Sequence, residues 1–295
     1  MTSPLEAQKV KASIMTTTDS TAGSKQSSNN STPLLIEPKA ALEHVGNPDV
    51  CIVDLSAEAS FQSGHIPGAI HVSPKELMLG QPPAPGKLPP IERLEALFSR
   101  LGLTPNTHFI VCDDEGGGWA GRFIWTLDVI SHRRYSCIDG GMVAWKAEQL
   151  PLEQAIQAPE ATEVKIEINT DVIAEISDIE KGIADQSITV WDARSLEEYQ
   201  GTKVLAAKGG HIPGAIHCEW TDLMDKNQGL RLRKDAKAML AERGIDGTKT
   251  TITHCQSHHR SGFTYLVGKY LGFDMRGYHG SWSEWGNNPN TQVER

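Results

Sequence analysis

Long apolar segments, paired cysteines and an excess of basic charge are all absent from this sequence. No apolar run approaches the roughly 20 residues that a membrane-spanning helix needs, so we expect no membrane association. Lys and Arg number 28 against 37 Asp and Glu, and the net charge of −9 argues against nucleic-acid binding. The five cysteines are scattered and form no Cys-x-x-Cys pair, which argues against a disulfide framework or a cysteine-rich zinc site. We therefore expect a cytoplasmic protein without a metal or other cofactor.

The N-terminal segment is also poor in apolar side chains. Residues 1–33 are rich in Ser, Thr and Asn and contain no continuous apolar stretch of the kind found in secretory signals. We expect this segment to be a disordered tail. In the whole chain 39% of the residues are hydrophobic and 22% are charged, which is typical of a globular protein. With 295 residues the chain is long enough for two domains.

An internal repeat sets the domain organisation. The segment Gly64-His-Ile-Pro-Gly-Ala-Ile-His71 recurs without change as Gly210-His-Ile-Pro-Gly-Ala-Ile-His217. Three further pairs of similar segments follow in the same order, namely 52–56 with 190–194, 110–113 with 252–255, and 139–145 with 279–285. This pattern predicts two homologous domains, residues 34–150 and 176–295. We interpret residues 151–175 as a linker. The alternation of apolar and charged residues at 164–168 is typical of a strand.

Each half alternates segments typical of strands with segments typical of helices. Strands are predicted at 51–55, 108–112, 189–192 and 251–253, and helices at 91–101, 235–243 and 262–271. A capping box at Ser177-Asp-Ile-Glu180 predicts the start of the first helix of the second half. Alternation of this kind indicates an α/β fold in which each domain has a central parallel sheet with helices on both faces.

Cys255 follows a predicted strand and precedes a predicted helix, with a polar loop between them. The N-terminus of a helix and converging backbone N–H groups favour a thiolate, which is the nucleophilic form of cysteine. Ligands of open parallel sheets bind at the carboxyl ends of the strands, where Cys255 lies. The alternative is a buried structural cysteine. The matching position of the first half is Asp113, so we expect only the second domain to be active.

The motifs together resemble the two-domain rhodaneses, which are thiosulfate sulfurtransferases. The resemblance covers about residues 34–290 and rests on the two Gly-His-Ile-Pro-Gly-Ala segments, on residues 192–201, on the Cys255 loop and on the Gly- and Trp-containing segment near each domain's end. The loop Cys-Gln-Ser-His-His-Arg is similar to that of a bacterial subgroup with Cys-Gln-Thr-His-His-Arg. It departs from the Cys-Gly-Ser-Gly-Val-Thr loop of mercaptopyruvate sulfurtransferases.

The resemblance implies a set of functional residues. Cys255 would be the nucleophile and carry a persulfide, and Arg194 and Arg260 would bind the substrate. Gln256, Ser257, His258 and His259 would form the remainder of the active-site loop. The implied donor is thiosulfate, and the implied acceptor is cyanide or a thiol, including thioredoxin-like proteins.

Several alternatives remain open at this stage. His258 and His259 could tune the potential or bind substrate, could be exposed without a direct role, or could ligate a metal. The whole protein could prefer 3-mercaptopyruvate, or could be a sulfur-carrier or redox module without turnover. A Cys-dependent phosphatase, which the order His254, Cys255 and a following Arg resembles, is disfavoured, because four residues instead of five separate Cys255 from Arg260.

Overall fold

The computed structural model describes residues 32–295, and within them are two parallel sheets whose four corresponding strands have the same order, the first sheet having β1 as an additional edge strand. The first sheet runs β1-β5-β4-β2-β3 and the second β11-β10-β6-β7. The strands of the first sheet are β1 (Leu35–Ile36), β2 (Val50–Asp54), β3 (Ile70–His71), β4 (His108–Cys112) and β5 (Tyr135–Ile138). Those of the second are β6 (Ile188–Asp192), β7 (Ile216–His217), β10 (Thr250–His254) and β11 (Met275–Gly277). A short antiparallel ribbon of β8 (Met224–Asp225) and β9 (Arg231–Leu232) accompanies the second sheet.

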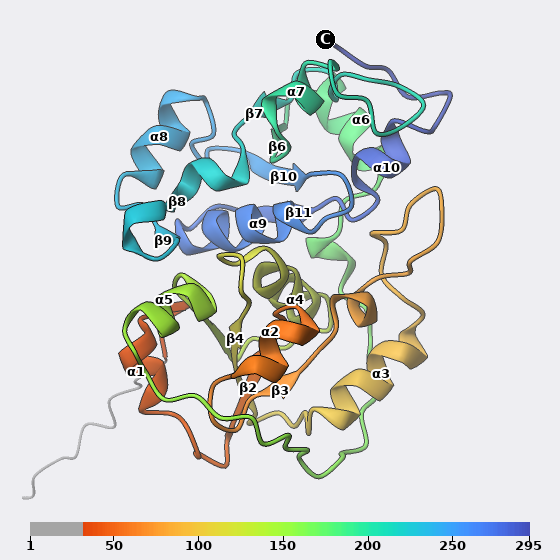
Figure 1. The fold of residues 1–295 in the computed structure, drawn as a ribbon. Coiled ribbons are helices and arrows are strands. Elements are labelled where there is room, and N and C mark those ends of the chain that lie inside the picture. Colours follow the sequence, from red (N-terminus) through yellow and green to blue (C-terminus); the bar gives the residue numbers. More distant parts are fainter. Residues whose placement is uncertain (1–31) are drawn as a thin grey trace, which may run out of the picture. The chain divides into compact units, whose positions relative to one another are not determined.

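Helices cover both faces of each sheet (Figure 1). In the first half these are α1 (Pro38–Leu42), α2 (Glu58–Ser63), α3 (Ile91–Arg100), α4 (Gly118–Val129) and α5 (Gly141–Ala147). In the second half they are α6 (Ile176–Ala184), α7 (Leu196–Tyr199), α8 (Ala236–Glu242), α9 (Arg260–Tyr270) and α10 (Ser281–Trp285). The predicted α/β class, with a parallel sheet between helices in each domain, is confirmed.

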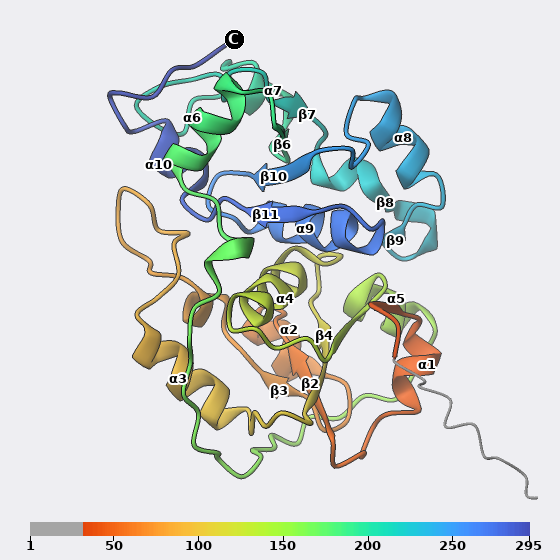
Figure 2. The same ribbon diagram turned by 180° about the vertical axis from the view of Figure 1, so that it is seen from behind.

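Strand alternation explains how the apolar residues divide among three cores. Ile52 and Ile110 point to a core with α1, α2 and α5, whereas Val53 and Val111 point to the opposite face. That opposite face belongs to one large core, which also includes residues of α3, α4, α8 and α9. α4 and α9 therefore lie side by side between the two sheets, as both ribbon views show (Figures 1 and 2).

The two Gly-His-Ile-Pro-Gly-Ala segments have equivalent structures. His65 stacks on Phe61 and hydrogen-bonds to its backbone oxygen, and His211 does the same with Tyr199. Each histidine also forms an isolated β-bridge, His65 with Glu153 at the start of the predicted linker and His211 with Glu294 near the end of the chain. The sequence repeat is therefore also a repeat of local structure.

Most predicted elements are confirmed, and two are corrected. The predicted helices at 91–101, 235–243 and 262–271 correspond to α3, α8 and α9. The capping box that opens α6 is formed by Glu175 and Asp178, so the helix begins at Ile176 and the predicted box at Ser177 was placed too late. No strand forms at 164–168, because the described residues there have no neighbouring strand to pair with.

Two observations concern the chain as a whole. The predicted tail at 1–33 falls almost entirely outside the described residues. Within residues 32–295, no helix is both long and apolar enough to cross a membrane.

Candidate active site

Cys255 lies directly after β10 and is almost completely buried, with 1% of its surface exposed. A loop of four residues, Gln256 to His259, connects it to α9, whose first residue is Arg260. Burial alone would raise the pKa of the Cys255 thiol. The charge of Arg260, hydrogen bonds from Ser261 and the charge of His259 outweigh burial and hold this pKa below its usual range. The site therefore favours a thiolate.

His258 occupies the interior of the site. Its ring is fully buried, and its Nδ1 lies 2.7 Å from the Oγ of Ser261, the residue that also hydrogen-bonds to Cys255. Burial, followed by the charge of Arg122, holds the pKa of His258 well below its usual range, so the ring is neutral at pH 7. The expectation of an exposed loop residue is wrong for His258, because its side chain packs edge-on against Trp125 of α4.

His259 is held by the first half of the chain. Its ring stacks on Trp119 with a centroid separation of 4.0 Å, and its Nε2 contacts the carboxylate of Glu115. Trp220 packs against the same ring edge-on. The loop of the second domain is thus anchored by two side chains of the first.

Arg260 is paired inside its own domain. Its Nη1 and Nη2 donate to the two carboxylate oxygens of Glu198, at 2.6 and 2.9 Å. Burial opposes ionisation of Glu198, but this bidentate contact holds the pKa of the carboxyl below its usual range. The pair fixes the guanidinium at the start of α9, beside the thiolate.

Arg194 is deeper in the domain than a freely accessible substrate ligand would be. It is 1% exposed, and its Nε and Nη2 donate to the carboxylate of Asp192, with the closest contact at 2.6 Å. Nη2 also donates to the backbone oxygen of Gly210, and the guanidinium lies 4.3 Å from the ring centroid of Trp282. Among the described hydrogen bonds, its Nη1 is the guanidinium nitrogen that has no acceptor.

The first domain places a carboxylate where the second has Cys255. Asp113 follows β4 as Cys255 follows β10, and its carboxylate accepts hydrogen bonds from four backbone N–H groups. These donors belong to Glu115, Gly117, Trp119 and Ala120. In the Cys255 loop, the equivalent N–H groups of Ser257 and His259 have no acceptor among the described residues. Burial, followed by the charge of Glu115, raises the pKa of Asp113 to about 6 despite these hydrogen bonds, so the carboxyl group is still mostly ionised at pH 7.

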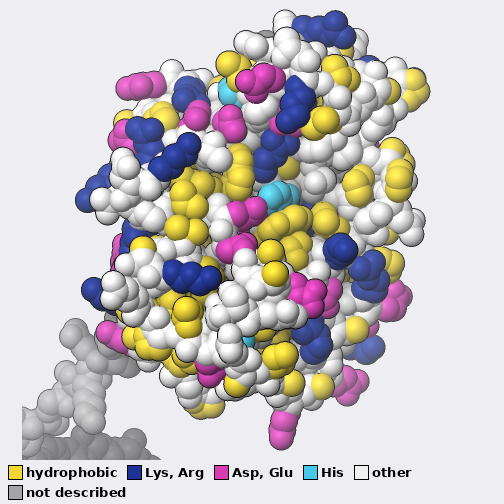
Figure 3. All heavy atoms as spheres, viewed as in Figure 1, with side chains coloured by type: hydrophobic (Ala, Val, Ile, Leu, Met, Phe, Trp, Pro, Cys, Tyr) yellow, Lys and Arg dark blue, Asp and Glu magenta, His cyan; other side chains and the backbone are white. Residues whose placement is uncertain are grey.

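A hollow opens beside the Cys255 loop. It has a volume of about 580 Å³ and is lined by Gln256 and Ser257 together with Pro82, Pro83, Pro85, Leu205, Ser283 and Asn287. The Gln256 side chain donates to the Leu205 backbone oxygen at 3.2 Å, which closes one edge of the hollow. On the face seen in Figure 3, a His and acidic side chains lie near the centre, with apolar side chains on both sides of them.

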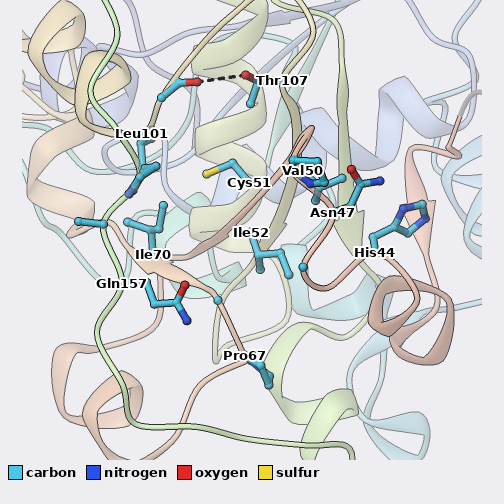
Figure 4. A pocket seen from close by; sticks show the side chains of 16 residues that line it. His44, Asn47, Val50, Cys51, Ile52, Pro67, Ile70, Leu101, Thr107 and Gln157 are labelled. Atoms are coloured by element: carbon cyan, nitrogen blue, oxygen red, sulfur yellow. Dashed lines mark hydrogen bonds between the residues drawn. The ribbon is translucent and has the colours of Figure 1, made fainter.

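A second cavity lies elsewhere in the first domain (Figure 4). It has a volume of about 270 Å³, is lined by Cys51, Ile70 and Leu101 among others, and includes none of the loop residues. Burial raises the pKa of Cys51 to about 12, so its thiol stays protonated. Within residues 32–295, no group of three or more His, Cys, Asp or Glu side chains is placed to hold a metal ion.

The sequence singled out Cys255, Arg194, Arg260 and the four loop residues, and the structure gathers the loop and Arg260 around the thiol. Sequence reasoning missed the residues that hold this group, namely Ser261, Glu198, Glu115, Trp119 and Arg122. Ser261 could have been found from its place in the first turn of the predicted helix. Glu198 is distant in sequence and becomes a neighbour through the fold of the second domain, whereas Glu115, Trp119 and Arg122 become neighbours through the packing of the two domains.

Comparison with known proteins identifies the family. The model of the rhodanese-like domain matches the chain twice, at residues 37–148 and 175–288. A thiosulfate sulfurtransferase of Azotobacter vinelandii is 50% identical over 265 residues, which cover 90% of this chain and 98% of that protein. A 3-mercaptopyruvate sulfurtransferase of Escherichia coli is 27% identical over 267 residues, which cover 85% and 94%.

A solved structure agrees in fold. The 3-mercaptopyruvate sulfurtransferase SseA of Escherichia coli matches with a TM-score of 0.73 at 24% identity, over 85% of this chain and 99% of that one. The chain therefore belongs to the rhodanese family of sulfurtransferases, with one rhodanese-like domain in each half.

Proposed function

We propose that this protein transfers the outer sulfur of thiosulfate to a thiophilic acceptor through a persulfide on Cys255. The observation that carries the proposal is the Cys255 loop, in which a buried thiol with a lowered pKa lies among Arg260, Ser261 and loop N–H groups. The 50% identity to a thiosulfate sulfurtransferase over nearly the whole of both chains supports thiosulfate as the donor. From the loop Cys-Gln-Ser-His-His-Arg of this chain, we further propose that it belongs to the bacterial subgroup with a Cys-Gln-[Ser/Thr]-His-His-Arg loop.

The first half-reaction is a displacement at sulfur. The Cys255 thiolate attacks the outer sulfur of thiosulfate, a new S–S bond forms, and sulfite leaves with the electron pair of the bond that breaks. Arg260 and Arg194 attract the dianionic donor, and because each already pairs with a carboxylate, they bind it through N–H groups that are left over, such as Nη1 of Arg194. The hollow beside Gln256 and Ser257 gives the donor access to the loop.

The second half-reaction removes the transferred sulfur from Cys255. An acceptor such as cyanide or a thiolate attacks the outer sulfur of the persulfide, and the Cys255 thiolate is released. The persulfide anion is held between the two steps by loop N–H groups acting as an anion nest. The Asp113 carboxylate, held by four N–H groups in the first domain, supports this role for the equivalent loop.

Further proposals concern the chain's organisation. We assign residues 34–150 to a non-catalytic domain, 151–175 to a linker and 176–295 to the catalytic domain, and Asp113 makes the first domain inert. We propose the cytoplasm as the compartment, since all five cysteines are free.

Thioredoxin-like proteins are proposed as cellular acceptors.

Steady-state kinetics test the proposal. Cys255→Ala should abolish thiocyanate formation from thiosulfate and cyanide, whereas Cys51→Ala, which removes another buried thiol, should retain it. The wild-type kcat/KM should be at least about tenfold higher for thiosulfate than for 3-mercaptopyruvate. A preference for 3-mercaptopyruvate would overturn the choice of donor. Sulfur uptake without release to cyanide would indicate a carrier.

A further inference from the structure

The charges around the Cys255 loop are almost all compensated. Arg260 is paired with Glu198, Arg194 with Asp192, and the ring of His259 with Glu115. Each cation that the loop or its own domain provides therefore has a carboxylate beside it. Arg260, Ser261 and His259 already lower the pKa of Cys255, and a further positive charge without its own carboxylate would stabilise a thiolate or persulfide there more strongly.

Arg122 provides that charge from the first domain. Its side chain is completely buried on α4, and no carboxylate among the described residues forms an ion pair with it. Its Nη2 donates to the backbone oxygen of Leu77 at 2.7 Å, and its Nη1 lies 3.4 Å from the backbone oxygen of His258. Its Nε has no acceptor in the described part of the chain, and the guanidinium lies 4.7 Å from the ring centroid of Trp125.

The packing of two helices brings Arg122 to the loop. A side chain on Gly121 would meet the backbone of Gly262 at 2.2 Å, and one on Gly262 would meet the backbone of Arg122 at 2.4 Å. α4 and α9 therefore touch along their backbones at the position of Arg122. The contact to His258 supports the one loop residue with a left-handed backbone, at a φ of 56°.

The electrostatic environment of Arg122 is unusual. Burial lowers the pKa of Arg122 to about 9, and the single group that opposes this effect is Cys255. A buried guanidinium without a carboxylate is costly, because removing a charge from water must be offset by an anion or by hydrogen bonds. Two backbone oxygens offset only part of that cost. Cys255, which follows the strand that leads into the same loop, is the ionisable group whose charge opposes the lowering, and its thiolate is therefore the candidate counter-ion.

We propose that Arg122 of the first domain is the buried counter-cation of the Cys255 thiolate and persulfide, and a positioning residue for the loop through His258. This inference rests on the proposed function only in taking Cys255 as the nucleophile. It gives the inert domain a part in the reaction, because the domain without a nucleophile supplies the uncompensated charge for the domain with one.

Other ionisable groups also face this region. They are His254 on β10, Asp192 and Arg194 at the end of β6, Glu198 on α7, His259 and Arg260 at the start of α9, His279 before α10, and Glu115 before α4. None of these groups changes in the variants of Arg122 proposed below, so a shift in the ionisation of Cys255 reports on Arg122.

Alkylation of Cys255 by iodoacetamide across a range of pH tests the proposal without any sulfur donor. The reaction is selective for Cys255, since burial raises the pKa of the other four cysteines, Cys51, Cys112, Cys137 and Cys218. Arg122→Gln keeps hydrogen-bond donors but removes the charge. It should raise the apparent pKa of Cys255 by about one unit, so that alkylation on the acid side slows about tenfold.

Two further variants give the controls. Arg122→Lys keeps the charge and should alkylate within about threefold of wild type. Arg93→Gln removes another first-domain arginine without a carboxylate partner, whose guanidinium contacts only the Lys75 backbone oxygen, and should leave the profile unchanged. A folded Arg122→Gln with the wild-type profile would overturn the proposal, as would equal effects of Gln and Lys.

A second pair of variants leaves Arg122 in place. If Arg122 needs an anion, Cys255→Asp should unfold at a higher temperature than Cys255→Asn, as measured by circular dichroism at pH 7. Equal or lower stability of the Asp variant contradicts the proposal. Neither measurement uses sulfur transfer, so the proposed function can fail without affecting this result. An enzyme that transfers no sulfur but shows the predicted alkylation profile would contradict the proposed function and still support the role of Arg122.

Discussion

Three carboxylates hold two arginines and one histidine around Cys255 in fixed positions. Glu198 holds Arg260, Asp192 holds Arg194 and Glu115 contacts His259. Pairing reduces the net charge of the site, but it keeps the guanidinium groups from reorienting when an anionic substrate, such as the proposed donor, arrives and leaves. This preorganisation favours binding of a developing negative charge at no cost in rearrangement.

Arg194 gives a prediction that separates stability from substrate binding. Arg194→Ala leaves Asp192 buried without its guanidinium partner, with only the backbone N–H of residue 194 and His254 beside it, and should lower the free energy of unfolding by about 3 kcal/mol. Arg194→Lys keeps the charge but not the two-pronged contact, and should raise KM for thiosulfate about tenfold with a smaller loss of stability. Urea denaturation and steady-state kinetics measure the two effects. An unchanged KM in a folded Arg194→Lys would show that Arg194 does not anchor the substrate.

Single residues were predictable from the sequence where the signal was local. Cys255 and Arg260 stand five positions apart at a strand–helix junction, so their proximity follows from the chain itself. Glu198 and Glu115 could not be assigned in this way, because each meets the loop only after distant segments have packed together. From the sequence alone, both glutamates would be interpreted as ordinary charged residues of the surface.

At the scale of the elements, periodicity predicted α3, α8 and α9, while the start of α6 was placed too late. Glu175 caps α6 and also contacts Lys87 and His279. Its pKa is lowered to about 2, chiefly by the hydrogen bond with His279. A glutamate in a capping role is uncommon, and tertiary contacts favoured it here over the Ser177 that local preference selects.

The close backbone contact between α4 and α9 can be tested by a substitution that adds a single methyl group. Gly262→Ala places a Cβ 2.4 Å from the Arg122 backbone nitrogen, so the two helices must separate, at a cost of about 3 kcal/mol. Activity should fall as well, because Arg260 and Ser261 move with α9. Thermal unfolding and turnover provide the measurements.

Gly268→Ala is the matched control in the same helix. The new Cβ meets the Met275 sulfur at 2.3 Å, which is the flexible end of a side chain that can move aside. Its stability and activity should stay closer to wild type than those of Gly262→Ala. Equal losses in both variants would contradict a special role for the helix crossing.

For the molecule as a whole, the repeat predicted two similar domains but not how they cooperate. The four corresponding strands of the two sheets have the same order, and equivalent loops follow β4 in the first sheet and β10 in the second. The first loop is filled by its own Asp113 carboxylate, whereas the second presents Cys255. The contacts of Glu115, Trp119 and Arg122 with the second loop depend on how the domains pack, and no repeat in the sequence encodes that packing.

The most direct test of the central claim is the intact mass of the protein after incubation with thiosulfate. If Cys255 carries the persulfide, the protein should gain one sulfur atom, about 32 Da, on the peptide that contains Cys255. Cyanide should remove the added mass, and Cys255→Ala should not acquire it. Absence of the gain, or sulfur bound at another cysteine, would contradict the account.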